Sequence, residues 1–318
     1  KLVNGIFPSL DQSIVGASVA IIFTIINLLG IRFSGITQFM LTLILFAGII
    51  IFIIFGIPKI DINNFTPFFG RGVSGIFLMI PIAMLAFMGY DVLPQAAEEV
   101  KAPIRKLVFI IPISIFFVAF IYIMVLVVSV GLVHWEIIAK NQEQIPIIPS
   151  IVKALGKNGP FIVIVSGICG LITTMNAFLV GGSRLLYAMS QDGELPNIFS
   201  KISKSTSIPF VGIIFIGLLG IVGSFVQELI VLFDTAASAV LVSYFLVPLT
   251  VIILRKKEPK LERPYMIKYY PYIPVIAAIA IVPTWIISIG LLKLWALGIF
   301  IGWGILGSIY YLLERKYK

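Results

Sequence analysis

Apolar residues in this chain follow one another in long runs, with short polar segments between them. A helix that crosses a bilayer needs about 20 apolar residues, and nine runs reach roughly that length. These runs cover residues 14–31, 36–57, 74–95, 107–133, 160–189, 208–226, 229–254, 271–292 and 294–313. None shows the two-residue alternation of a transmembrane barrel strand. The pattern therefore predicts an all-α polytopic membrane protein with nine transmembrane helices.

The composition supports this interpretation and excludes several other classes of protein. Of the 318 residues, 60% are hydrophobic and only 12% are charged, with a mean hydropathy of +1.12, whereas a soluble domain is about half apolar and a quarter charged. The single Cys and single His exclude a disulfide framework and a His-rich metal centre. The Lys and Arg residues behind the net charge of +9 lie mainly between the apolar runs. We therefore expect the lipid bilayer as a partner and no nucleic acid. We expect neither a cofactor nor a metal.

Lys and Arg in the loops indicate which way the helices run, because cytoplasmic loops of membrane proteins are enriched in both. If residues 1–13 lie outside, sixteen of the 23 Lys and Arg residues fall on the inner side and seven on the outer side. This bias predicts a cytoplasmic C-terminus in the plasma membrane. The chain opens on Lys1 without the pattern of a signal peptide. Since nine helices leave the N-terminus outside, we expect an odd number of helices upstream.

The run at 74–95 differs from the other eight because Pro81, Gly89, Asp91 and Pro94 interrupt it. Proline removes a backbone donor and glycine loosens the helix, so we expect the helix to open near Gly89. A charged Asp91 at the bilayer centre would cost about 2.5–3.5 kcal/mol. A discontinuous helix with an acid beside the break indicates a transporter binding site. The alternative is a kinked helix whose Asp91 is hydrogen-bonded near the inner interface and has no functional role.

Three motifs resemble the amino acid–polyamine–organocation (APC) superfamily of permeases. The sequence AFMGYD at 86–91, followed by EEVKAPIR at 98–105, is similar to the sixth-helix signature of that superfamily. Asn176-Ala177, SRLLYAM at 183–189 and DGELP at 192–196 resemble its eighth helix and the following loop. NLLGI at 27–31 resembles the junction between its fourth and fifth helices. The order and spacing agree over essentially the whole chain.

The resemblance implies a leucine-transporter-like inverted-repeat fold, in which two five-helix repeats each begin with a broken helix. The chain would then form one membrane transport domain over 1–318 that runs from the fourth to the twelfth helix. Residues 1–57 would end a truncated first repeat, 74–254 would form the complete second repeat, and 271–313 would form two C-terminal helices.

The resemblance also assigns roles to the broken sixth helix. Its backbone carbonyls at Phe87, Met88 and Gly89 match positions that bind the substrate amino group, with an apolar side chain as a gate. Carbonyls freed from a helix are fixed acceptors for an ammonium group, and an aromatic ring over a cation adds about 0.5–2 kcal/mol. The alternative interpretation of Phe87 is that its ring only packs within the helix bundle.

On the run at 160–189, polar Thr173, Thr174 and Asn176 lie within about one helical turn, and Phe178 follows. Phe178 matches a position where an aromatic ring covers the substrate. We expect Thr173, Asn176 and Phe178 to face the same mid-membrane cavity as the sixth-helix residues. The two threonines have two further interpretations, as part of a sodium site or as small residues that mediate helix packing.

Coupling to an ion is the least constrained part of the prediction. Some proton-coupled members carry a lysine in the fifth helix, but the matching position is near Ile44 and the run 36–57 has no lysine. Asp91 is then the candidate for proton coupling, because a carboxyl in an apolar site can titrate near neutral pH. Glu98 and Glu99 are expected to form a gating ion-pair cluster at the cytoplasmic end.

These observations together predict a secondary active transporter, a symporter or antiporter, that moves amino acids by alternating access. Its partners would be a small amino acid or related amine and H+ or Na+; an amine or polyamine transporter of the same fold is the alternative. Tyr90-Asp91 is also found in intramembrane aspartyl proteases, but the second Gly-x-Gly-Asp motif of those enzymes does not occur here. The re-entrant pore segment that is typical of a channel is not seen in the sequence either. A transporter-like sensor is a further alternative that the sequence leaves open.

Overall fold

The computed structural model describes residues 11–70, 72, 74–90, 92–95, 104–140, 145–226, 228–263, 265–290 and 292–317. Within these ranges the regular structure is helical and no strand occurs, as the apolar runs predicted. Six helices of the described residues are long and apolar enough to cross a membrane. They are α2 (Ile31–Gly56), α5 (Ile104–Leu132), α8 (Gly159–Gln191), α10 (Leu229–Lys257), α11 (Tyr272–Gly290) and α12 (Leu294–Tyr317).

The other three predicted runs form shorter helices. The first becomes α1 (Gln12–Leu28), which ends at a tight turn where Gly30 has a φ of 119°. The sixth becomes α9 (Phe210–Gly223), and the third is split into α3 (Ser74–Ala86) and α4 (Val92–Gln95). Short helices in the connections are η1 (Ile57–Lys59), η2 (Ile62–Phe65), α6 (Trp135–Lys140) and α7 (Ile148–Leu155).

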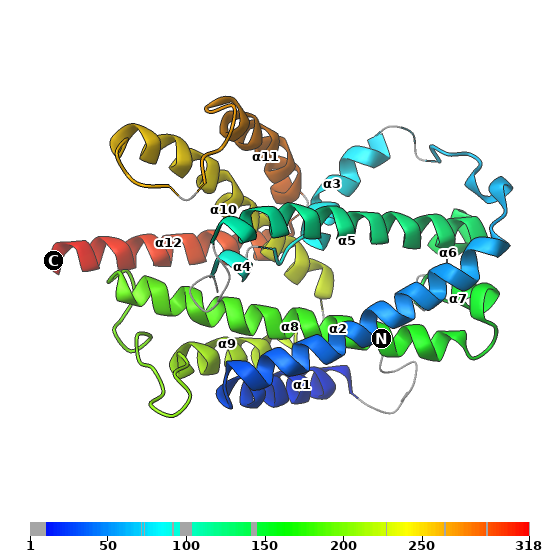
Figure 1. Ribbon diagram of the computed structural model, residues 1–318, viewed down its shortest axis with the longest axis horizontal. Coiled ribbons are helices and arrows are strands. Elements are labelled where there is room, and N and C mark those ends of the chain that lie inside the picture. The colour runs from blue at the N-terminus through cyan, green and yellow to red at the C-terminus, as the bar shows by residue number, and fades with distance from the viewer. Residues whose placement is uncertain are drawn as a thin grey trace. The chain divides into compact units, whose positions relative to one another are not determined.

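The helices divide into two compact units, whose elements are labelled in Figure 1. The first unit comprises Lys1–Gly70, Gly89–Lys101 and Ile111–Gln227, and therefore holds α1, α2, α4, most of α5 and α6 to α9. The second comprises Arg71–Met88, Ala102–Ile110 and Glu228–Lys318, and therefore holds α3 and α10 to α12. The boundary between the units at Met88 and Gly89 coincides with the break that separates α3 from α4.

Close helix packing in the first unit depends on small residues. A Cβ added at Gly48 of α2 would collide with the Ser166 side chain of α8, and one at Gly217 of α9 would collide with Thr24 of α1. Gly212 of α9 similarly lies against the Ser183 backbone of α8. Because lipid tails are as apolar as Leu, helices in a membrane associate through close contact of this kind. α1, α2, α8 and α9 accordingly pack side by side (Figure 1).

Replacing Gly48 with alanine is expected to lower the stability of the purified chain by about 1–3 kcal/mol, the usual cost of overpacking a core. The added methyl group would force α2 away from Ser166, which also donates a hydrogen bond to the Ile44 carbonyl of α2 at 3.3 Å. Gly35→Ala is the matched control, because it lies on the same helix with no atom within 4 Å of an added Cβ. Thermal unfolding in detergent measures both; equal midpoints would contradict the packing argument.

One end of the first unit is closed by an apolar cluster. The cluster joins α2, α5 and α7 through Phe52, Ile53, Val128, Leu132, Ile151 and Ala154. Two lysines hold the same end: Lys59 donates to the Ala154 carbonyl at 2.7 Å, and Lys153 donates to the Leu132 carbonyl at 2.8 Å. Cations there satisfy the unpaired carbonyls at the C-termini of α7 and α5 and oppose the negative ends of the helix dipoles.

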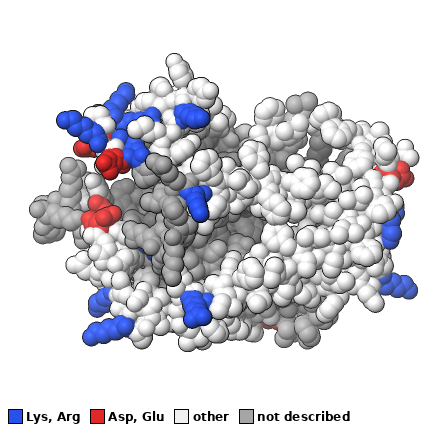
Figure 2. All heavy atoms as spheres, in the orientation of Figure 1, with Lys and Arg blue, Asp and Glu red and all other residues white. Residues whose placement is uncertain are grey.

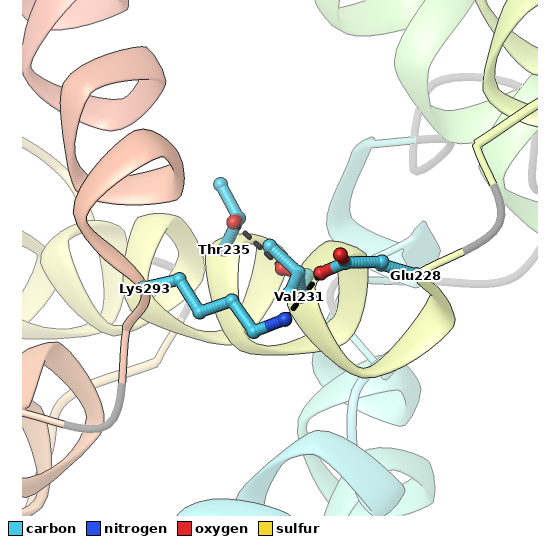
Figure 3. Close-up of polar contacts among 4 residues, drawn as sticks. All are labelled: Glu228, Val231, Thr235 and Lys293. Atoms are coloured by element: carbon cyan, nitrogen blue, oxygen red, sulfur yellow. Dashed lines mark hydrogen bonds and ion pairs between the residues drawn. The ribbon is translucent and has the colours of Figure 1, made fainter.

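The second unit is held together by α10 and α11. Ser238 and Ser288, both buried, share a hydrogen bond of 2.9 Å between these helices. At the start of α10, the Glu228 carboxylate forms an ion pair with Lys293, which precedes α12 (Figure 3). The Lys293 Nζ lies 2.6 Å from the Glu228 Oε2. Both charged side chains are about half exposed, so the pair contributes at most about 1 kcal/mol. It nevertheless ties the connection before α12 to α10.

Candidate functional site

The interruption predicted near Gly89 is present. α3 ends at Ala86, where the Phe87 N–H is shared between the carbonyls of Ala83 and Met84 at 3.2 Å each. The chain then turns until Val92 begins α4, with the Val92 N–H bonded to the Gly89 carbonyl at 3.3 Å. The helical ladder is therefore replaced by a turn over four residues, which confirms the predicted break.

Gly89 is required by its backbone conformation and not by crowding. Its φ of 114° lies in a region that side chains with a Cβ rarely adopt, while nothing lies within 4 Å of an added Cβ. A residue held in such a conformation costs about 1–3 kcal/mol unless it is glycine. The chain therefore depends on Gly89 for the direction in which α4 leaves the turn.

The residues predicted to bind substrate are divided between the two units. Phe87 and Met88 belong to the second unit, whereas Gly89 belongs to the first, and all three are half-buried. Thr173, Asn176 and Phe178 all lie on α8 in the first unit, against which α4 packs. The shared cavity therefore stays a prediction. Three further predicted residues lie outside the described ranges: Asp91, Glu98 and Glu99.

A buried network of side-chain amides joins α1, α2 and α8. The Asn27 amide nitrogen donates to the Asn176 side-chain oxygen at 2.7 Å and to the Phe23 carbonyl of its own helix at 2.8 Å. The Asn176 amide nitrogen in turn donates to the Gln38 side-chain oxygen at 2.9 Å. The Ser34 hydroxyl lies 3.0 Å from the Asn27 oxygen and 3.2 Å from the Asn176 oxygen.

This network places Asn176 in the interior of the first unit. The side chains of Asn27, Ser34 and Asn176 are 4%, 2% and 2% exposed, so water does not reach them. Both polar ends of the Asn176 side chain are engaged by other side chains, which locks its orientation. The network ends at Gln38, which is half-buried. Asn176 therefore fixes α8 against α1 and α2, and its amide is hydrogen-bonded to Asn27 and Gln38.

Thr173 and Phe178 lie on different faces of α8. Thr173 is 7% exposed and its hydroxyl donates to the Gly170 carbonyl at 2.8 Å, on the same buried face as Asn176. Phe178 is 42% exposed, because two helical positions turn it about 200° from Asn176. Thr174 shares the more exposed side and also donates to Gly170, at 2.9 Å. Of the three α8 residues predicted to bind substrate, Thr173, Asn176 and Phe178, only Phe178 has an exposed side chain.

Sequence reasoning singled out Asn176 as a substrate-binding candidate and did not identify its hydrogen-bond partners. Asn27 and Ser34 fall within or beside the NLLGI motif, which was interpreted only as a junction between two helices. Their signal was present in the sequence, because a polar side chain within an apolar run requires a partner inside the protein. The identity of that partner was not, since 149 residues separate Asn27 from Asn176.

No group of three His, Cys, Asp or Glu side chains within the described ranges could hold a metal ion. The Thr173 and Thr174 hydroxyls considered for a sodium site both donate to the same carbonyl, of Gly170. Each keeps oxygen lone pairs that can act as acceptors. These oxygens could contribute to a cation site only together with further ligands.

Comparison with known proteins agrees with a polytopic membrane protein. The chain matches the family model described as amino acid permease over residues 2–312. It is 30% identical to the methylthioribose transporter of Bacillus subtilis (strain 168) over 82% of its length, and 28% identical to the branched-chain amino acid permease of the same bacterium over 91%. It is 27% identical over 79% of its length to cationic amino acid transporter 2, vacuolar, of Arabidopsis thaliana.

The chain spans 56%, 61% and 40% of the lengths of these three relatives. All three are named as transporters or a permease and none as an enzyme, in agreement with the prediction. The apolar helices and the family match identify a multi-pass membrane protein. With a family model that covers nearly all of its residues, the chain belongs to the amino acid permease family.

Proposed function

We propose that the complete protein is a secondary active transporter that carries amino acids or closely related molecules across the plasma membrane by alternating access. The observation that carries this proposal is the helix interrupted at Gly89 in a chain of the amino acid permease family. An interrupted helix in a membrane exposes backbone carbonyls that can bind a cationic or polar group without a charged side chain. Transport is driven by H+ or Na+ symport or by exchange.

The proposed substrate contacts follow the positions that match the family. Phe87, Met88 and Gly89 supply carbonyls and an apolar gate at the break, and Phe178 covers the substrate from α8. Thr173 and Asn176 hold α8 in place from its buried face, which the Asn27–Asn176 hydrogen bond supports. In this proposal Asn176 acts through its neighbours, and its amide becomes a direct ligand only if the network opens.

Ion coupling and gating are proposed for three acidic residues, Asp91, Glu98 and Glu99. Asp91 follows the break by two residues, where a carboxyl can exchange a proton with the cavity. The two glutamates precede Lys101 and Arg105 at the cytoplasmic end, where ion pairs can form and break. The C-terminus lies in the cytoplasm, as the distribution of Lys and Arg supports. Residues 74–254 form the second repeat, 1–57 belong to the first, and 271–313 follow both.

Uptake into proteoliposomes by the complete protein tests the proposal. The relatives carry different substrate names, so the panel contains labelled leucine, arginine and methylthioribose. Each is offered under an imposed pH gradient, a Na+ gradient or an internal load of unlabelled substrate. Accumulation of at least one compound that depends on one of these conditions is the expected result. Binding without accumulation under any condition would favour a sensor instead.

Phe178→Ala in the complete transporter is expected to raise the KM for uptake about tenfold, because an aromatic ring over a cation is worth about 0.5–2 kcal/mol. Phe161→Ala is the matched control, since Phe161 lies on the same helix and is 61% exposed. Its KM is expected to stay within twofold of the unmodified protein. If both variants shift KM equally, or if Phe178→Ala leaves KM unchanged, Phe178 does not contact the substrate.

A further inference from the structure

The last turn of α10 and the loop that joins it to α11 carry a concentration of cations. Residues 255–268 include six Lys and Arg residues and two Glu residues, which gives a net charge of +4. Figure 2 shows Lys and Arg gathered with acidic residues at the upper left, where Figure 1 places this loop, while most of the visible surface is uncharged. The cations are Arg255, Lys256, Lys257, Lys260, Arg263 and Lys268.

Arg263 folds this loop back onto the end of α10. Its guanidinium donates to the carbonyls of Leu261 at 2.8 Å, Glu258 at 2.7 Å and Leu254 at 3.3 Å. The last carbonyls of a helix have no partner within the helix, so this arginine satisfies them and closes the end of α10. Arg263 therefore holds the first part of the loop against the end of α10.

A groove of about 440 Å³ lies beneath the folded loop. Its walls are mainly apolar, with Val251, Leu254, Leu261 and Ile267 among them, while Arg255 lies on its lining. Glu262 and Arg263 also contribute to the lining, so its cations outnumber its single carboxylate. An apolar groove with a cationic surround matches a molecule that has a hydrocarbon part joined to an anionic part.

Arg255 is the cation best placed for recognition. Its guanidinium lies 4.3 Å from the centre of the Tyr270 ring, which holds the side chain half-buried. None of the described residues accepts a hydrogen bond from this guanidinium, in contrast to that of Arg263. A guanidinium has five donors in a planar fork that suits a phosphate group. Within the described part of the chain, the donors of Arg255 are therefore open to a ligand.

Exposed aromatic and apolar side chains place the loop at a membrane surface. Tyr265, Met266, Tyr269 and Tyr272 are 46%, 65%, 77% and 70% exposed. Tyrosine is enriched where a membrane protein passes through the head-group region, because its ring is apolar and its hydroxyl is polar. The loop follows the C-terminus of a helix long enough to cross the bilayer, so its depth agrees with this placement.

We propose that the end of α10 and the α10–α11 loop together form a binding site for an anionic phospholipid of the cytoplasmic leaflet. The phosphate is bound by Arg255 with Lys256 and Lys257, and part of an acyl chain lies in the groove against Leu254 and Leu261. Anionic lipids of that leaflet attract basic segments beside a membrane helix. Both parts of the lipid are needed, because the cations supply preference for the head group and the groove supplies retention.

Native mass spectrometry of the purified chain tests the site, with phosphatidylglycerol and phosphatidylcholine of identical acyl chains as probes. The unmodified protein is expected to bind phosphatidylglycerol preferentially. Each cation near the surface is worth about fivefold, so Lys256→Gln/Lys257→Gln is expected to reduce the preference about twentyfold. Both lysines are exposed, so the fold is expected to persist. Arg255→Gln is expected to reduce it at least fivefold.

The matched control is Lys201→Gln/Lys204→Gln, which removes two exposed lysines from the α8–α9 connection, on the same side of the membrane in the proposed topology. Its preference should stay within twofold of the unmodified protein. Equal losses in both double variants would mean diffuse attraction and would overturn the site. Displacement of the lipid by millimolar glycerol phosphate would show a site for soluble phosphate instead. A Leu261→Ser variant that keeps full affinity for long-chain phosphatidylglycerol would remove the groove from the proposal.

Discussion

Replacing Asn176 with leucine is expected to destabilise the purified chain by about 2–5 kcal/mol, because each buried polar group left without a partner costs about 1–3 kcal/mol. The change removes one of the two acceptors of the buried Asn27 amide and the donor to the half-buried Gln38. Leucine has the same branched arrangement of heavy atoms as asparagine but is larger, so the loss combines the unpaired polar groups with some overpacking of the buried site. A lower midpoint of thermal unfolding in detergent is the measurement.

Two further variants separate this effect from a general intolerance of α8. Thr174→Leu introduces the same residue on the exposed side of the helix and is expected to shift the midpoint little. The double variant Asn27→Leu/Asn176→Leu removes both partners and should recover part of the loss, because paired apolar replacements leave fewer polar groups unsatisfied. An Asn176→Leu midpoint equal to that of Thr174→Leu would show that the network contributes nothing to stability.

Gly89→Ala is expected to reduce uptake by the complete transporter at least tenfold. Alanine at a φ of 114° costs about 1–3 kcal/mol of backbone strain, so the turn between α3 and α4 relaxes to another conformation. The carbonyls that we propose as substrate ligands then lose their positions. Since the added Cβ meets no atom within 4 Å, a steric effect on neighbouring helices is excluded for the described residues.

Gly223→Ala is the matched control for the backbone argument. Gly223 ends α9, also has nothing within 4 Å of an added Cβ, and does not have a positive φ. Both variants are compared by initial rates of uptake in proteoliposomes at equal protein incorporation. The argument requires that only Gly89→Ala loses activity; similar rates for the two variants would show that the turn tolerates a side chain.

The lengths of the helices were only partly predictable. The long apolar runs at 36–57, 107–133 and 160–189 correspond to α2, α5 and α8, because burial in lipid depends on local composition. α1 stops at Leu28, three residues before the predicted end, because Gly30 adopts a positive φ and starts a turn into α2. An apolar sequence specifies that a segment enters the membrane, but the turn that ends its helix need not be polar.

The sequence by itself determined that this protein is helical, that it belongs in a membrane, and that its third apolar run is interrupted at Gly89. Each of these properties depends on residues close together in the chain: an apolar run, or prolines and a glycine within one run. Tertiary structure alone decided that Asn27, Ser34 and Gln38 surround Asn176, and that Phe178 lies on the open face of α8. The partner of a buried amide is set by which helices pack together, and that contact links residues 138 to 149 positions apart.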